Sequence, residues 1–98
     1  MAIEHITPAG GNVFEELGFA PDEAENLKVR TTLMAAIKRV IRERGLKQTA
    51  AAELFGTTQP RISQLMNGHI DEFTIDTLIN MLGRAGIHAE IHIPLETA

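Results

Sequence analysis

The sequence contains no cysteine and no long apolar run. The absence of cysteine excludes a disulfide framework, a thiolate zinc site and a thiol nucleophile. No apolar run approaches the roughly 18 residues that span a membrane, and the N-terminus has neither the basic nor the apolar region of a signal peptide. We therefore expect a cytoplasmic protein with no membrane partner.

Patterns typical of catalysis are also missing. No serine or threonine lies in a glycine-framed nucleophile elbow, and no glycine-rich loop of the phosphate-binding kind is present. His88, Glu90 and His92 alternate near the C-terminus and could form a three-ligand metal set. Alternating polar residues on a half-solvated strand produce the same pattern, so we expect no metal, no cofactor and no enzymatic activity.

The composition is typical of one small globular domain, with 98 residues of which 44% are hydrophobic and 22% are charged. A domain of this size buries only roughly 60 to 65% of the surface of its unfolded chain. Its core is therefore thin, and a second subunit would help to stabilise it. Dimerisation is expected.

Charge is sorted along the chain, although the net charge is only -4. Residues 1–26 carry six acidic residues and no lysine or arginine, and from Asp71 onward five acidic residues oppose Arg84. Residues 27–70 carry eight basic residues against two acidic ones; the basic residues are Lys28, Arg30, Lys38, Arg39, Arg42, Arg44, Lys47 and Arg61. A basic centre between acidic ends indicates two different partners.

Capping and breaking residues predict about five helices. Asparagine or threonine precedes three of them as an N-cap, proline opens the longest, and glycine follows most of their ends. The expected helices run from Asn12 to Glu16, from Pro21 to Arg44, from Gln48 to Phe55, from Thr58 to Met66 and from Thr74 to Arg84. Pro8, Gly10 and Gly11 break regular structure, so residues 1–11 are expected to be a flexible tail.

After Gly86 the spacing of apolar residues changes from the three to four residues typical of a helix to every second residue. Ile87, Ala89, Ile91 and Ile93 alternate with polar residues until Pro94. This pattern predicts a β-strand at 87–93 in a domain that is otherwise helical. A lone strand leaves its backbone donors and acceptors unpaired, so we expect it to pair with the same strand of a second copy across a two-fold axis.

Two of the expected helices form a helix-turn-helix. Ala52 stands where two helices cross closely, Gly56 supplies the turn, and Ile62 and Leu65 point inward from the second helix. Four compatible residues at fixed spacing are a specific signal. The second helix is then expected to enter the major groove of DNA.

The segment from Leu46 to Gly68, LKQTAAAELFGTTQPRISQLMNG, resembles the DNA-binding core of Xre/Cro/cI-type repressors. From Asn12 through the strand at 87–93, the chain is similar to the HigA-like antitoxins of that superfamily. The resemblance implies an all-α, lambda-repressor-like bundle and a dimeric operator-binding repressor. It also implies a basic, mRNA-cleaving toxin as a possible partner. Two positions depart from the family pattern: Lys47, where the first helix often has a serine or threonine cap, and Met66, where some members have an acid.

Physical reach assigns roles to the candidate DNA-binding residues. Gln59 and Gln64 carry amides that can read base edges, and Arg61 can chelate guanine or clamp a phosphate. The remaining candidates suit phosphate oxygens or add sequence-independent attraction; they are Arg44, Lys47, Gln48, Thr58, Ser63 and Asn67. Such a protein would be associated with the nucleoid through its DNA.

Phe14, Leu17 and Phe19 admit two interpretations: they dock on the protein's own long helix, or they bind a basic toxin that the acidic residues attract. The function expected is a transcriptional repressor that is also an antitoxin. The alternatives are a repressor with no toxin partner and a helix-turn-helix module that binds no DNA. The expected division of the chain is 1–11 tail, 12–26 acidic segment, 27–86 helix-turn-helix domain, 87–93 dimerising strand and 94–98 tail.

Overall fold

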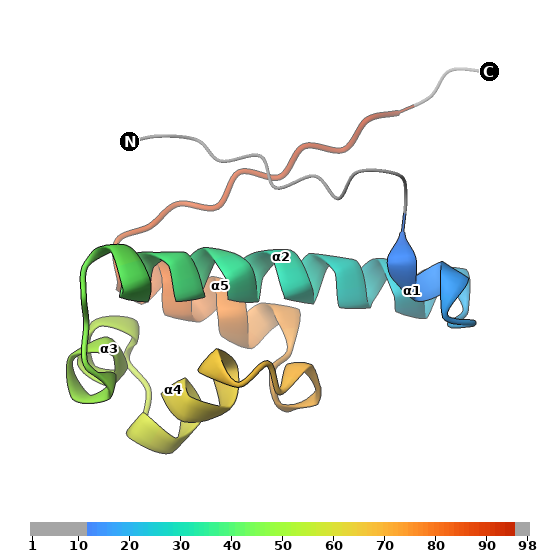
Figure 1. The fold of residues 1–98 in the computed structure, drawn as a ribbon. Helices are drawn as coiled ribbons and strands as arrows, with labels where there is room; N and C mark the ends of the chain where they lie inside the picture. The colour runs from blue at the N-terminus through green and yellow to red at the C-terminus, as the bar shows by residue number, and fades with distance from the viewer. Residues whose placement is uncertain (1–11, 96–98) are drawn as a thin grey trace.

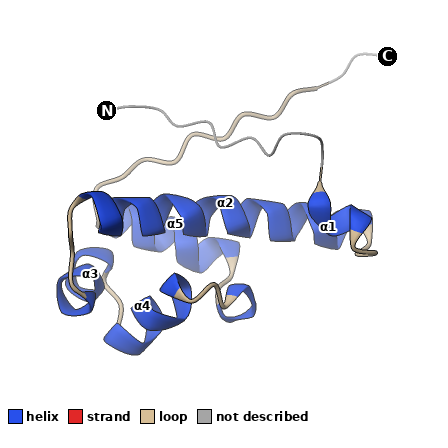
Figure 2. Cartoon of the chain, in the orientation of Figure 1, coloured by secondary structure: helices blue, strands red, loops and turns tan. Residues whose placement is uncertain are grey.

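The computed structural model describes residues 12–95, and every regular element in that range is a helix (Figures 1 and 2). The elements are α1 (Val13–Glu16), α2 (Pro21–Glu43), α3 (Gln48–Phe55), α4 (Gln59–Met66), the 3-10 turn η1 (Ile70–Glu72) and α5 (Ile75–Arg84). The five α-helices are those predicted from the sequence. The 3-10 turn was not predicted.

The helix ends follow the predicted local chemistry. Asn12 Oδ1 accepts a hydrogen bond from the Phe14 N–H at 3.0 Å, and Thr74 Oγ1 accepts one from the Thr77 N–H at 3.2 Å. Proline opens α2, where its missing N–H would have no intrahelical partner. Gly45, just beyond α2, has a φ of 58°, in the left-handed region that terminates helices.

Helices α2, α3, α4 and α5 are arranged as one bundle (Figure 1), and a single hydrophobic core joins them. Its largest fully buried side chains are Phe55, Phe73, Ile37, Ile62, Leu65, Leu78 and Met81. Phe73 precedes the Thr74 cap and Leu78 lies four positions after it, an arrangement that fixes the direction in which the chain enters α5. The core thus holds α3 and α4 against the long helix.

The N-terminal part of α2 extends past this core and packs against α1 (Figure 1). Ala24 and Leu27 are buried there, outside the main core. Because α2 is continuous from residue 21 to 43, the expected boundary between residues 26 and 27 lies inside one helix. The acidic segment and the helix-turn-helix are therefore joined by a rigid element.

The predicted strand at residues 87–93 is wrong for the single chain, because residues 12–95 contain no strand (Figure 2). The Ile87 N–H donates to the Leu82 carbonyl at 3.0 Å and closes the end of α5. Ile91 and Ile93 beyond it are 78% and 70% exposed. A β-strand exists only through hydrogen bonds to a neighbouring strand, and the described chain provides no such neighbour.

Candidate nucleic-acid interface

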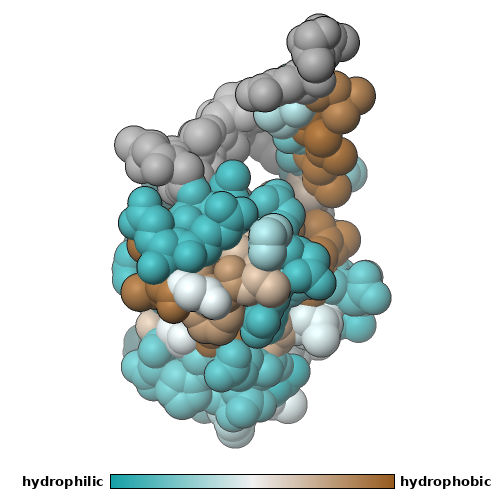
Figure 3. Space-filling model, turned by 90° about the vertical axis from the view of Figure 1, so that its right-hand side faces the viewer, coloured by the Kyte–Doolittle hydropathy of each residue, from teal (hydrophilic) through white to brown (hydrophobic). Residues whose placement is uncertain are grey.

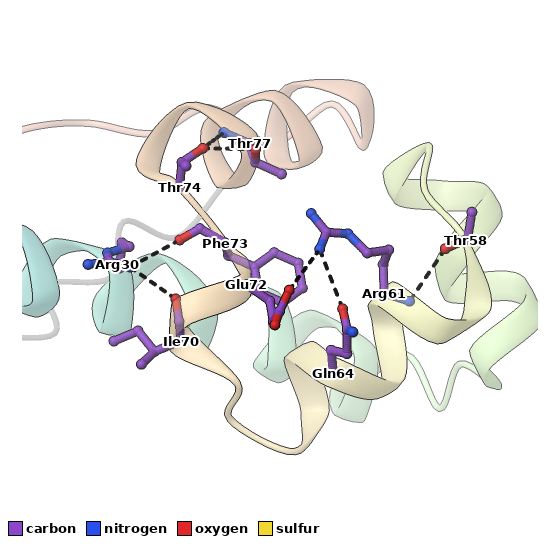
Figure 4. Close-up of polar contacts among 9 residues, drawn as sticks. All are labelled: Arg30, Thr58, Arg61, Gln64, Ile70, Glu72, Phe73, Thr74 and Thr77. Atoms are coloured by element: carbon purple, nitrogen blue, oxygen red, sulfur yellow. Dashed lines mark hydrogen bonds and ion pairs between the residues drawn. The ribbon is translucent and has the colours of Figure 1, made fainter.

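The N-terminal turn of α4 is open to solvent. Thr58 is its N-cap, and the Thr58 Oγ1 accepts a hydrogen bond from the Arg61 N–H at 3.4 Å (Figure 4). Gln59 and Pro60 form the first two helical positions, and both side chains are exposed. Ile62 and Leu65, one turn further on, are fully buried and attach the opposite face of α4 to the core. Gln59 therefore faces solvent, while the opposite face of α4 is packed in the core.

The turn between α3 and α4 is held by a residue from α5. Gly56 has a φ of 64°, in the left-handed region that only glycine enters at little cost, and Ala52 on α3 is buried close by. Arg84 Nη1 donates to the Gly56 carbonyl at 3.3 Å. A Cβ at position 56 would clash with the Arg84 side chain. The turn thus depends on glycine for its backbone conformation, and a side chain at position 56 would also displace the exposed Arg84 side chain.

Arg61 lies across the loop that follows α4 (Figure 4). Its guanidinium carbon is 4.7 Å from the centroid of the Phe73 ring, within the range of a cation–π interaction. Nη1 lies 3.4 Å from Gln64 Oε1 and 3.9 Å from Glu72 Oε2. The structure therefore turns this candidate DNA contact toward its own protein.

Arg30 of α2 fixes the other side of that loop. Its Nη1 donates to the carbonyls of Ile70 at 3.1 Å and Phe73 at 3.4 Å (Figure 4). Its Nε donates to Asn26 Oδ1 at 2.7 Å. Sequence reasoning missed Arg30, Arg84 and Glu72 as residues that shape the site. Arg30 lies 40 and 43 positions from its carbonyl partners, and Arg84 lies 28 positions from Gly56, so no local pattern indicates these contacts.

The remaining candidates occupy two places. Ser63 and Asn67 lie one turn apart on the outer part of α4, with the Asn67 Nδ2 at 3.5 Å from the Ser63 Oγ. Arg44, Lys47 and Gln48 are exposed at the end of α2 and the start of α3. Lys47 occupies the N-cap of α3 and makes no side-chain capping bond, as its replacement of a serine or threonine implies.

The α1 end of the molecule combines hydrophobic and hydrophilic surface (Figure 3), and its hydrophilic residues include the acidic Glu15 and Glu16. Phe14 is half-buried, and its ring meets that of Phe19 edge-on at 6.1 Å. Val13 and Leu17 are exposed, Leu17 at 69%, beside the exposed Glu15 and Glu16. Phe14 thus packs within its own chain, whereas Leu17 faces solvent.

Among residues 12–95 no three His, Asp or Glu side chains come together as a metal site, so His88, Glu90 and His92 do not form one there. No helix in the same range is both long and apolar enough to cross a membrane.

Comparisons with known proteins agree with this geometry. Residues 13–94 match a family of helix-turn-helix domains. The chain is also similar to a solved structure assigned to the XRE family of transcriptional regulators, with a TM-score of 0.69 and 31% sequence identity over 76% of this chain and 83% of that one. No curated protein gives a significant match.

The fold and the solvent-exposed N-terminal turn of α4, together with these matches, define a DNA-binding transcriptional regulator of the helix-turn-helix class. Within that class, the chain belongs to the XRE-type helix-turn-helix family.

Proposed function

We propose that this protein is a repressor that binds a specific operator as a homodimer and regulates its own operon. The observation that carries the proposal is the N-terminal turn of α4, where Thr58 caps the helix and Gln59 is exposed while Ile62 and Leu65 anchor the opposite face. A helix presented in this way fits the major groove, where side chains near its N-terminus meet base edges.

The proposed contacts divide by chemistry. Gln59 and Gln64 read base edges through their amides. Thr58, Ser63 and Asn67 have short polar side chains that suit phosphate oxygens. Gln48 lies at the N-terminus of α3, where its amide and the backbone N–H groups can also bind a phosphate. Arg44 and Lys47 are exposed and add attraction that does not depend on sequence.

The proposed dimer forms through the C-terminal segment. Ile91 and Ile93 are the basis for this part of the proposal, because they are mostly exposed and would lie on the same face of a strand. Pairing residues 87–93 with the same residues of a second copy would bury both and would satisfy the backbone groups. A symmetric dimer would then hold two α4 helices for two half-sites.

A fluorescence-anisotropy titration tests operator binding. The probe is the DNA immediately upstream of the protein's own gene, at two salt concentrations, with an unrelated duplex as the control. Gln59→Ala is expected to cost about 1 to 3 kcal/mol on the upstream DNA and little on the unrelated duplex. Asn80→Ala, which removes an exposed amide from α5, is the matched control and should bind like the wild type. Equal losses on both duplexes for Gln59→Ala would contradict a base-reading role, and no selectivity for any DNA would favour a module used for protein contacts.

A second candidate function, that of an antitoxin, is favoured by the surface of α1. Val13 and Leu17 are exposed apolar residues surrounded by acidic ones, a combination suited to a basic protein partner. We propose that this surface binds a basic toxin of the mRNA-cleaving type. A repressor with no toxin partner would use the same segment only for folding.

Co-expression with the product of the neighbouring gene tests the antitoxin role. If that product arrests growth, wild-type protein should restore it and Leu17→Glu should not, because a charge would be placed in the contact. Asp76→Ala, on exposed surface of α5, serves as the control and should restore growth. If Leu17→Glu restored growth as well as the wild type does, the toxin contact would have to lie elsewhere than on α1.

A further inference from the structure

A groove follows one face of α2. It consists of two adjoining hollows of about 210 and 290 Å³, which share Phe14, Thr31 and Ala35 as lining residues. Lys28 lines only the first hollow, beside α1, and Lys38 lines only the second, beside the loop that follows α4. The two hollows together, named here the α2 groove, therefore have a lysine at each end, and the lysines are about 15 Å apart along the helix.

The floor of the α2 groove is apolar although it contains two threonines. Thr31 Oγ1 donates to the Leu27 carbonyl at 2.8 Å, and Thr32 Oγ1 donates to the Lys28 carbonyl at 3.0 Å. Both hydroxyl protons are thus used within α2 and are not available to a ligand. An occupant of the groove therefore needs apolar side chains for the floor and an acidic group for a lysine at the end.

Asn12, which lines the first hollow, has an unused hydrogen-bond donor. Its Oδ1 accepts from the Phe14 N–H at 3.0 Å, so the other atom of the amide is the nitrogen, a donor. This Nδ2 is buried and has no hydrogen-bond partner within residues 12–95. Because a buried donor without an acceptor costs free energy, an occupant that brings a carbonyl oxygen to Asn12 would be favoured.

Residues 1–11, which were expected to be a flexible tail, lie outside the described residues and lead directly into Asn12. Their sequence contains Ile3, Ile6 and the acidic Glu4, with no lysine or arginine. An extended chain of this length reaches roughly 35 Å, about twice the distance between the two lysines of the groove. Since the segment is joined to the chain at one end of the groove, its local concentration there is high compared with that of a separate partner.

We propose that the α2 groove binds residues 1–11 of the same chain. The segment leaves Asn12 and runs toward Lys38. A backbone carbonyl close to Asn12 accepts from the Asn12 Nδ2, the two isoleucines cover the apolar floor, and Glu4 pairs with Lys38. Glu4 precedes Asn12 by eight positions, so an extended chain between them spans roughly 25 Å and is long enough for this pair.

The docked segment would connect two parts of the molecule. Phe14 of α1 lines both hollows, and Gly68 and Ile70, which follow α4, line the second. A chain lying in the groove therefore crosses α2 from α1 to the end of the helix that is proposed to enter DNA. Docking requires neither the proposed operator contact nor the proposed toxin contact, so it can be tested on the protein alone.

The first test uses the absence of cysteine from the chain, which allows a nitroxide spin label at one chosen position. The label is attached to Thr7→Cys in the full-length protein, and amide resonances are compared before and after the nitroxide is reduced. The resonances of Thr31, Ala35 and Ile70 should lose intensity. Those of α3, at the other end of α2, should lose the least (Figure 1). Equal losses in the groove and in α3, or no loss in either, would overturn the proposal.

A mixed sample determines which copy supplies the segment. Isotope-labelled protein without the nitroxide is mixed with spin-labelled protein without the isotope, so that only contacts between copies reduce the intensity. The groove resonances should keep their intensity in this mixture. If they lost as much as in the first sample, the groove would bind the segment of a second copy, and docking within one chain would be wrong.

The second test changes the floor of the groove. Ala35→Glu places a charge among the apolar contacts and should restore most of the intensity lost at Thr31 and Ile70. Ala50→Glu, the same substitution at an exposed position of α3, is the matched control and should leave the loss unchanged. Circular dichroism of both variants verifies that the helices are retained. An unchanged loss in a folded Ala35→Glu would overturn the proposal.

The third test exchanges the charges of the proposed ion pair. Lys38→Glu should weaken docking and reduce the loss of intensity at Ile70. Adding Glu4→Lys to Lys38→Glu should bring the loss back, because the pair is formed again with its charges reversed. A general disturbance of α2 by Lys38→Glu would not be corrected by a change at position 4. Failure of the double variant to recover the loss would therefore contradict the assigned pair and the direction of the segment.

Discussion

The helical bundle and the C-terminal segment place the same residue type in opposite environments. Ile37 and Ile62 in the bundle are fully buried, whereas Ile91 and Ile93 in the segment are 78% and 70% exposed. In the bundle the helices of one chain supply every contact that an isoleucine needs. In the segment those contacts are absent among residues 12–95. The bundle is therefore stabilised by contacts within one chain, whereas the segment depends on a second copy only if the proposed dimer forms.

The sharpest test of this comparison is the same substitution in both regions. Ile62→Ala should lower the free energy of unfolding by about 2 to 5 kcal/mol, because it leaves a cavity in a core that cannot fully collapse. Ile91→Ala at low protein concentration should change it by less than about 0.5 kcal/mol, since no packed contact is lost. Urea unfolding followed by circular dichroism measures both. Similar losses in dilute solution would mean that the segment packs on its own chain.

The turn of the helix-turn-helix provides the next test, because its glycine is constrained by a distant part of the same bundle. Gly45 and Gly56 have nearly the same φ, at 58° and 64°, but only Gly56 faces another side chain, that of Arg84. Gly45→Ala should cost about 1 kcal/mol for the left-handed backbone alone. Gly56→Ala should cost about 1.5 to 2 kcal/mol, because the exposed Arg84 side chain must also move away from the turn and lose its hydrogen bond to the Gly56 carbonyl.

A double-mutant cycle separates the two contributions at Gly56. In an Arg84→Ala background the clash is absent, so the cost of Gly56→Ala should fall to that of Gly45→Ala. If Gly56→Ala costs the same with and without Arg84, the close approach of α5 to the turn has no energetic consequence.

The C-terminal segment gives the third test, which concerns assembly. Ile91→Asp combined with Ile93→Asp should shift the protein to monomer in sedimentation analysis and weaken operator binding at least about tenfold, because the two half-sites would no longer be engaged together. The free energy of unfolding of the monomer should not change. His88→Asp with His92→Asp, on the alternate positions of the segment, is the control for added charge. A double Ile variant that remained dimeric would place the interface elsewhere.

The same comparison explains how far the sequence alone predicts this molecule. Local chemistry determines where helices begin and end: Asn12, Thr58 and Thr74 cap them, and Gly56 supplies the left-handed turn, as predicted. Period two in residues 87–93 predicts a strand, which the described chain does not contain. It does not reveal whether a neighbouring strand exists, and the prediction of a strand failed on that point.

The candidate site shows the same limit. The amides and hydroxyls of α4 are found from the helix-turn-helix spacing, and their positions on the helix follow from its period. The contacts that Arg61 makes within its own chain could not be found in this way. Its contacts with Glu72 and Phe73 depend on the path of η1, which is itself fixed by Arg30 from 40 residues away. From its residue type alone, Arg61 is predicted to contact DNA. Only the tertiary structure shows which groups of its own chain the guanidinium faces.

The smallest expected effect separates folding from binding within the bundle. Thr58 and Thr74 are both N-caps, with hydroxyl oxygens that accept from backbone N–H groups at 3.4 Å and 3.2 Å. Thr58→Ala and Thr74→Ala should each lower the free energy of unfolding by about 1 kcal/mol. Only Thr58→Ala should also weaken binding to the upstream DNA, because only that hydroxyl lies at the N-terminus of α4. Thermal unfolding and anisotropy on the same samples give the two values. If both variants lost affinity equally, the loss would follow from stability, and Thr58 would be a cap without a phosphate contact.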